Sequence, residues 1–181
     1  MLDGLKAATV WKAHRKPWPV FAVQCLVLLA VILAGGKWFM AHYTLGLASG
    51  TPCLPGRLYL VEKGGQPVRH GLVAFRTDGR QRPYRPGTRF VKLVVGLPGD
   101  QVEINAACRG AVVRPDGAVY SFVLEDSVLD RLGKECRDFA ASYDIPPDSY
   151  FVMGTLPDSY DSRYWGLVSS EQVIGRAWKV F

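Results

Sequence analysis

The residue most able to do chemistry in this chain is a lysine inside an apolar stretch. Lys92 lies in residues 90–100, FVKLVVGLPGD, where β-branched residues are followed by a Pro-Gly turn. This pattern predicts a buried strand that enters a turn. Burial disfavours the ammonium form of a lysine, and a neutral amine can act as a general base near neutral pH. The alternative is a strand lysine whose ammonium reaches water along its aliphatic stem, with no catalytic role.

A second group of reactive side chains lies near the end of the chain. Residues 154–166, GTLPDSYDSRYWG, contain Ser159, Asp161, Ser162 and Arg163. Asp161 and Arg163 can form an ion pair that braces a loop, and the two serines supply hydroxyls within it. The same residues would also suit an ordinary loop that is stabilised by a salt bridge and does nothing else.

An uncharged apolar segment near the N-terminus determines where these residues can act. Residues 18–36 contain one polar side chain, Gln24, and can cross a hydrocarbon core of roughly 30 Å. Most of the basic residues of the N-terminal region precede this segment. The positive-inside rule therefore predicts a basic cytoplasmic N-terminus (1–17), a single transmembrane anchor (18–40) and an exported domain (44–181). A cleaved secretory signal is the alternative, with residues 48–50 as a possible cleavage site.

The overall charge of +6 and the pI near 9.3 would suit a nucleic-acid-binding protein. The basic residues are scattered, however, and form no Arg/Lys stripe with aromatic platforms. We therefore expect no nucleic-acid partner. Neither a cofactor nor a metal is expected.

The cysteines fit an exported domain. Cys25 lies in the apolar segment, while Cys108 and Cys136 lie in a part of the chain where an oxidising compartment would permit a disulfide. Their pairing leaves Cys53 as an odd cysteine that needs an explanation.

Short apolar runs separated by turn residues predict a mainly β fold of the barrel or sandwich type. A helix is expected over residues 126–142, begun by Asp126 or Ser127, inside an insertion (about 105–147) that carries a hairpin and this helix. The expected strands cover residues 57–62, 71–77, 90–96, 101–104, 118–124, 150–154 and 173–181.

Three of these segments, taken in order, resemble the type I signal peptidase family of Ser-Lys proteases. Residues 90–100 resemble its general-base box, and residues 159–166 resemble its S-x-D-S-R-x-x-G box. Residues 70–75 resemble the preceding strand, with Leu72 where the family usually has an acid. The resemblance runs from about residue 45 to the C-terminus. It implies a signal-peptidase-like β-barrel or sandwich catalytic domain behind a membrane anchor.

The segment that should carry the nucleophile departs from this pattern. Residues 51–59, TPCLPGRLY, resemble the T-x-S-x-P-x-G-x-Y motif of the conjugative-transfer (TraF-like) branch, with Gly56 one place early. Cys53 stands where the nucleophilic serine is expected, thirty-nine residues before Lys92. Residues 49–51 also resemble the S-G-S of the general signal peptidases, which would make Thr51 the nucleophile. We rank Cys53 first, Thr51 second and Ser49 third, with a structural Cys53 in a catalytically silent relative as the further alternative.

The resemblance implies a role for each matching residue. A neutral lysine amine activates the nucleophile in Ser-Lys enzymes, and a thiol needs less activation than a hydroxyl. A Cys–Lys pair could therefore act as thiol and amine or as thiolate and ammonium. By this resemblance Cys53 is the nucleophile, Lys92 is the general base, and Ser159 orients the base. The Thr51 hydroxyl and the Cys53 N–H form the oxyanion hole. The loop is supported by Asp161, Ser162 and Arg163.

By the same resemblance, the expected function is removal of leaders from exported precursors after small residues. The expected location is the bacterial inner membrane, with the catalytic domain in the periplasm. The resemblance to the TraF-like branch implies that the precursor is propilin, which would be matured by hydrolysis or cyclisation for conjugative type IV secretion. The expected partners are therefore propilin, the lipid bilayer and secretion components. A general housekeeping signal peptidase and a catalytically silent scaffold of a secretion assembly are the alternatives.

Overall fold

The computed structural model describes residues 18–47 and 53–181. The expected cytoplasmic segment (1–17) and two of the candidate nucleophiles, Thr51 and Ser49, lie outside the described residues. The chain separates into two compact units, one up to Met40 and one from Ala41 to Phe181.

The described part of the first unit lies in one long helix, α1 (Trp18–His42), near the N-terminus. Its 25 residues have a mean hydropathy of 2.3 over the most apolar window, and none of them is buried within the protein. A helix of this length extends about 38 Å, which exceeds the thickness of a hydrocarbon core. Because the helix is apolar on all sides, burial in lipid is the environment that suits it. It fits a membrane anchor, two residues longer than the span expected from the sequence.

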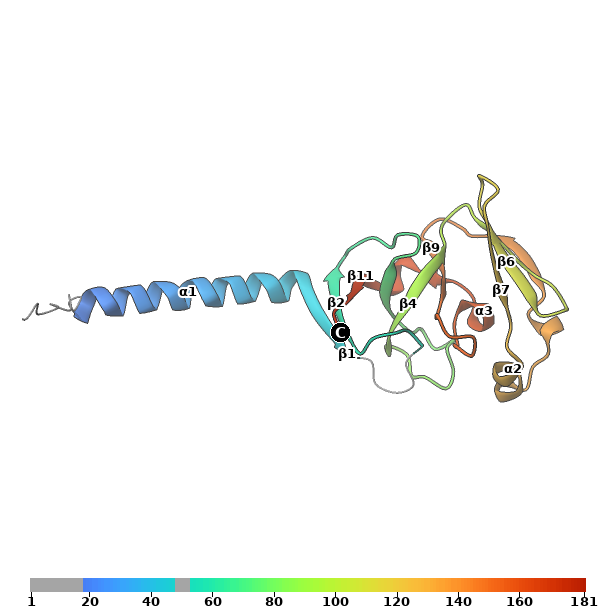
Figure 1. The fold of residues 1–181 in the computed structure, drawn as a ribbon, viewed down its shortest axis with the longest axis horizontal. Coiled ribbons are helices and arrows are strands. Elements are labelled where there is room, and N and C mark those ends of the chain that lie inside the picture. Colours follow the sequence, from blue (N-terminus) through green and yellow to red (C-terminus); the bar gives the residue numbers. More distant parts are fainter. Residues whose placement is uncertain (1–17, 48–52) are drawn as a thin grey trace, which may run out of the picture. The chain divides into compact units, whose positions relative to one another are not determined.

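The second unit contains a seven-stranded sheet in the order β1-β2-β11-β3-β4-β9-β10 (Figure 1). All the neighbouring strands of this sheet pair in antiparallel fashion, as expected for a chain with many short strands and tight turns. The strands are β1 (Tyr43–Leu47), β2 (Leu58–Lys63), β3 (Leu72–Arg76), β4 (Arg89–Gly96), β9 (Ser149–Met153), β10 (Val168–Ser169) and β11 (Val173–Lys179).

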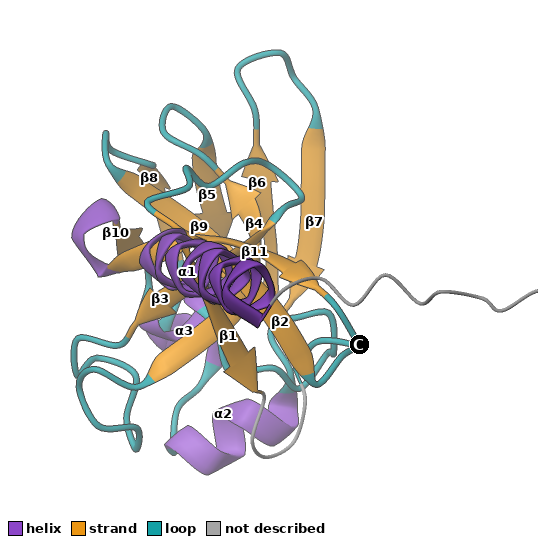
Figure 2. Ribbon diagram, turned by 90° about the vertical axis from the view of Figure 1, so that its left-hand side faces the viewer, coloured by secondary structure: helices purple, strands orange, loops and turns teal. Residues whose placement is uncertain are grey.

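A second, four-stranded sheet has the order β7-β6-β5-β8. Figure 2 shows its strands together with the short helices α2 and α3. Its members are β5 (Gln101–Ile104), β6 (Arg109–Val113), β7 (Val119–Val123) and β8 (Ala141–Asp144). The helical turns of the unit are α2 (Asp126–Leu132), α3 (Ser162–Trp165) and the 3-10 turns Cys136–Asp138 and Ser170–Gln172.

The mainly β fold behind an N-terminal apolar helix is confirmed. The expected helix over residues 126–142 begins at the expected residue, but its length and its capping residue are wrong. α2 ends at Leu132 because Gly133 takes a left-handed conformation, with φ 61°, that closes the helix. Residues 141–144 then form β8, which pairs with β5. The residue that caps the helix is Glu125, without a side-chain hydrogen bond, rather than Asp126 or Ser127.

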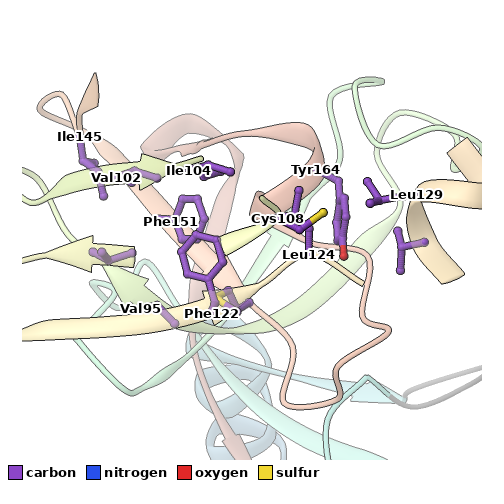
Figure 3. Packing of buried hydrophobic residues seen from close by; sticks show 13 residues of the cluster. Val95, Val102, Ile104, Cys108, Phe122, Leu124, Leu129, Ile145, Phe151 and Tyr164 are labelled. Atoms are coloured by element: carbon purple, nitrogen blue, oxygen red, sulfur yellow. The ribbon is translucent and has the colours of Figure 1, made fainter. Parts of the chain in front are cut away.

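The larger core cluster joins the second sheet to the rest of the domain. In Figure 3, Phe122 of β7 lies against Phe151 of β9, with ring centroids 5.5 Å apart. Tyr164 of α3 lies in the same cluster near Leu129 of α2. A disulfide joins Cys108 to Cys136 across the loop that contains β6, β7 and α2. The two sheets therefore share one core, which also contains part of the segment expected to carry chemistry.

Candidate active site

Strand β4 buries Lys92 in the seven-stranded sheet. Lys92 pairs with Val73 of β3, and it shares one face of the strand with Phe90 and Val94 because side chains alternate along a strand. Only 3% of Lys92 is exposed. Its Nζ donates a hydrogen bond of 2.7 Å to the Oγ of Ser159. The structure therefore joins the lysine and the serine that the sequence placed in different motifs.

Residue 154 lies where these groups meet. Leu93 pairs with Met153 in the antiparallel β4–β9 register, so continuing that register brings Gly154 beside Lys92. A Cβ built on Gly154 would collide with the Ser159 hydroxyl and would come within 3.0 Å of the Cys53 carbonyl oxygen. Glycine at this position thus permits the close approach of the Ser159 side chain and the Cys53 backbone.

The Cys53 backbone is held next to this glycine. Its carbonyl oxygen accepts a hydrogen bond from the Thr155 N–H at 2.9 Å and another from the Thr155 Oγ1 at 3.3 Å. Cys53 is half-buried and carries a thiol. The structure therefore gathers Cys53, Lys92 and Ser159 around Gly154, and the contact of Cys53 with Thr155 joins residues 102 apart in the sequence.

A buried ion pair shapes the loop that carries Ser159. The Asp161 carboxylate accepts hydrogen bonds from Arg163 Nε at 2.8 Å and Nη2 at 2.9 Å, and neither side chain is more than 3% exposed. It also accepts one from the Gly154 N–H at 2.9 Å. Arg163 Nη2 donates to the Ser159 carbonyl at 2.9 Å. The pair thus fixes the backbone on both sides of the Lys92–Ser159 contact.

Ser162 and Tyr164 attach the same loop to the two sheets. The Ser162 Oγ accepts a hydrogen bond of 3.0 Å from the Val152 N–H of β9. The Tyr164 hydroxyl accepts one of 2.9 Å from the Glu125 N–H, and Arg163 Nη1 donates to the Val123 carbonyl at 2.8 Å. The loop is therefore supported by β9 on one side and by the end of β7 on the other.

Burial affects the ionisation of this loop. Burial lowers the pKa of Arg163, but the hydrogen bonds and the charge of Asp161 outweigh it, so the pKa lies above the ordinary value of a guanidinium. Burial also raises the pKa of Tyr164. Both groups therefore keep their neutral-pH forms, cation and phenol, well into the alkaline range.

The charge of the Asp161 carboxylate is taken up by Arg163, and no ion pair among the described residues involves Lys92. Within the same part of the chain, no three His, Cys, Asp or Glu side chains are grouped so as to hold a metal ion. A buried amine next to a hydroxyl, with no carboxylate to hold its proton, is suited to accept a proton from a neighbouring acid.

Sequence reasoning missed Gly154 and Thr155 as parts of the site. Gly154 ends an expected strand, and together with Thr155 it opens the stretch that carries the serines, a place where a conformationally special residue was detectable. Their contact with Cys53 was not detectable, because nothing in the local sequence indicates which distant segment lies there.

The fold and this site define a class of protein. The chain belongs to the signal peptidase family, peptidase S26, whose family model matches residues 18–181.

The chain is similar both to a protein named for conjugal transfer and to proteins named signal peptidase I. The conjugal transfer protein TraF of Agrobacterium fabrum is 34% identical over 88% of this chain and 94% of its own length. A probable signal peptidase I-2 of Synechocystis is 30% identical over 64% of this chain and 48% of its own length. The signal peptidase I of Pseudomonas aeruginosa is 30% identical over 65% of this chain and 50% of its own. The chain thus spans about half the length of these two signal peptidases.

Proposed function

We propose that this chain is a membrane-anchored signal peptidase in which Lys92 is the general base and Cys53 the nucleophile. The observation that carries the proposal is the buried Lys92 amine, bonded to Ser159 at 2.7 Å beside the backbone of Cys53. Family membership supports the reaction class, and the contacts around Gly154 support the choice of residues.

The proposed reaction proceeds in two steps. The Cys53 sulfur attacks the scissile carbonyl carbon as its proton passes to the Lys92 amine, and the C–N bond breaks when the resulting ammonium returns that proton to the leaving amine. The acyl group is then on sulfur. In the second step Lys92 removes a proton from the attacking water or amine, and the thiol is regenerated. Ser159 keeps the amine directed at this site, and the Cys53 N–H with the Thr51 hydroxyl would bind the oxyanion.

The proposed substrates are exported precursors with a leader that ends in small residues. An extended leader segment would add to the sheet near β4 as a further strand. The likeness to a relative named for conjugal transfer supports propilin as the precursor and type IV secretion components as neighbours. Attack by water on the acyl-enzyme would give hydrolysis, while attack by the amino terminus of the pilin itself would give cyclisation.

The proposed placement follows from α1 and the basic residues before it. Residues 1–17 would lie in the cytoplasm, α1 would cross the bacterial inner membrane once, and residues 44–181 would lie in the periplasm.

Two alternatives remain distinct from this proposal. A housekeeping signal peptidase would process many unrelated precursors, whereas the proposed enzyme would prefer propilin. A silent scaffold would process none, and a merely structural role would not require a buried lysine amine bonded to a serine.

The test is propilin processing by the full chain in membranes. Lys92→Met and Cys53→Ala are expected to abolish cleavage, since each removes one partner of the proton transfer. Cys25→Ser, which changes the exposed cysteine of α1, should leave cleavage unchanged. Acid quenching followed by mass spectrometry should find a thioester on Cys53. Normal processing by both Lys92→Met and Cys53→Ala would disprove the catalytic proposal. An ester on Thr51 would instead assign that residue as the nucleophile.

A further inference from the structure

The connection between β3 and β4 is strongly basic. Residues 76–89, here called the basic loop, contain five arginines and one acidic residue, Asp78, a net charge of +4. Arg80 pairs with Asp78 at 2.7 Å, and the other four arginines take part in no ion pair among the described residues. These four exposed arginines are Arg76, Arg82, Arg85 and Arg89.

Two of these arginines oppose each other directly. Arg76 and Arg89 are paired residues in the β3–β4 register, at the base of the basic loop. Like charges directly opposite on neighbouring strands are destabilising. An anion bound beside them would relieve this repulsion.

The basic loop is ordered by its own hydrogen bonds. The Arg85 carbonyl accepts a hydrogen bond from Thr77 Oγ1 at 2.7 Å and another from Thr88 Oγ1 at 2.6 Å. The Gly87 N–H donates to the Thr77 carbonyl at 2.7 Å, and Gln81 is fully buried beneath the turn. A preformed backbone loses little conformational entropy when a ligand binds, so the entropy cost is confined to ordering the arginine side chains.

The basic loop also lies close to the proposed site. The ring of Tyr84 packs edge-on against Phe90, with centroids 4.8 Å apart, and Phe90 shares its face of β4 with Lys92. Tyr84 also acts electrostatically on Tyr160: burial raises the pKa of Tyr160, and the nearby Tyr84 adds to the effect. Tyr160 directly follows Ser159, so the tip of the basic loop lies beside both the strand that carries Lys92 and the loop that carries Ser159.

We propose that the basic loop is a docking surface that binds an acidic segment of the peptide substrate beside the scissile bond. This inference rests on the proposed function and adds the chemistry of the substrate. Carboxylates fit it because the planar guanidinium fork binds them through two parallel hydrogen bonds. Because Tyr84 of the basic loop contacts Phe90 of the strand that carries Lys92, a peptide held at the proposed site would reach the loop.

Binding is measured first, because it does not depend on turnover. Full-length Cys53→Ala protein in non-ionic micelles is titrated with two fluorescent leader peptides that differ only in an Asp-Asp or Asn-Asn pair. The pair is moved through each position flanking the scissile bond. At the position that meets the basic loop, the acidic peptide should bind about fivefold more tightly, the effect of two exposed ion pairs. This advantage should shrink as NaCl rises from about 50 to 500 mM.

Charge reversal then assigns the effect to the loop. Arg82→Glu with Arg85→Glu should remove the preference and favour a Lys-Lys peptide instead. Arg109→Glu with Lys134→Glu makes the same change of net charge at exposed positions of the second sheet region, and it should keep the preference for the acidic peptide. In the active enzyme, reversal should raise KM for the acidic peptide by more than about fivefold, because it replaces two attractions with two repulsions, and should leave kcat unchanged.

Three results would overturn the inference. One is equal affinity for the acidic and neutral peptides at every position. Another is an acidic preference that persists in Arg82→Glu with Arg85→Glu. The third is normal peptide binding by this variant together with loss of binding to vesicles of anionic phospholipid, which would assign the basic loop to the membrane. A wild-type enzyme that binds the acidic peptide tightly but cleaves none would instead disprove the proposed function alone.

Discussion

Removal of the Asp161 charge is expected to destabilise the domain strongly. In Asp161→Asn the side chain keeps its shape, but the Arg163 guanidinium is left in the interior without its counter-ion. Both side chains are at most 3% exposed, so water cannot replace the carboxylate. The remaining acceptors of Arg163 are the neutral carbonyls of Val123 and Ser159. Breaking a buried pair in this way costs about 3–5 kcal/mol. A domain of ordinary stability has about 5–15 kcal/mol, so the loss is a large fraction of the total.

The assay is urea unfolding of the full chain in non-ionic micelles, followed by tryptophan fluorescence. The exposed pair of Glu135 and Arg137 gives a matched control, because its side chains are 67% and 73% exposed. Glu135→Gln should cost less than about 1 kcal/mol. If Asp161→Asn also cost less than about 1 kcal/mol at an unchanged m-value, the reasoning from burial would be refuted. A second check is Asp161→Asn combined with Arg163→Met, which should be more stable than Asp161→Asn alone because no unpaired charge remains.

The pH dependence of this effect follows from the raised pKa of Arg163. A group with a raised pKa contributes stability that is fully present below its unfolded pKa and is lost as the pH rises through the folded value. The guanidinium therefore stays charged between about pH 6 and 9. The difference in the free energy of unfolding between wild type and Asp161→Asn should therefore stay constant over this pH range, because the arginine keeps its charge.

Three further changes have defined outcomes. Gly154→Ala should displace Ser159, reducing the proposed cleavage at least tenfold and costing about 1–3 kcal/mol in urea unfolding. Gly46→Ala should do neither, because a Cβ there would make only an ordinary contact of 3.9 Å with the Tyr59 carbonyl oxygen. Cys136→Ser should cost about 3–4 kcal/mol, because the disulfide closes a loop with a sequence separation of 28; an unchanged unfolding midpoint would contradict this. Burial raises the pKa of Tyr164, so the contribution of its phenol to stability should be lost as the pH rises above about 10. Tyr164→Phe should flatten that alkaline decline in stability. An unaltered pH–stability curve would disprove the attribution of the decline to Tyr164.

Local sequence patterns were sufficient for the strand around Lys92 and for the serine loop. The signal for this strand, an apolar run that ends in Pro-Gly, is contained in neighbouring residues. The observed strand β4 begins one residue before the expected stretch. β8 could not be predicted in the same way. Its four residues, Ala141–Asp144, are mostly exposed and include no β-branched side chain, and the strand exists because β5 offers a free edge to pair with. Helical spacing continued past Gly133 in the sequence, but the left-handed glycine and this pairing prevented a longer helix.

The site shows the same division between local and non-local information. The pairing of Asp161 with Arg163 joins residues two apart, and the sequence was enough to suggest it. The hydrogen bond between Lys92 and Ser159 spans 67 residues, and only the order of known family motifs suggested it. The contact of Cys53 with Thr155 spans 102 residues and had no sequence signal at all. Long-range contacts of this kind depend on the register of β4 and β9, which no single segment specifies.

The second sheet, which the sequence suggested was an insertion, supports the residues of the proposed active site. The segment between β4 and β9 supplies the Val123 carbonyl to Arg163 and the Glu125 N–H to Tyr164. It also contributes most of the core in which Tyr164 is buried (Figure 3). Arg163 in turn holds the Ser159 carbonyl, and Ser159 binds the amine of Lys92. A change in the packing of the second sheet would therefore reach Lys92, the proposed general base, through three successive contacts. This sheet is thus part of the support for the site rather than an appendage.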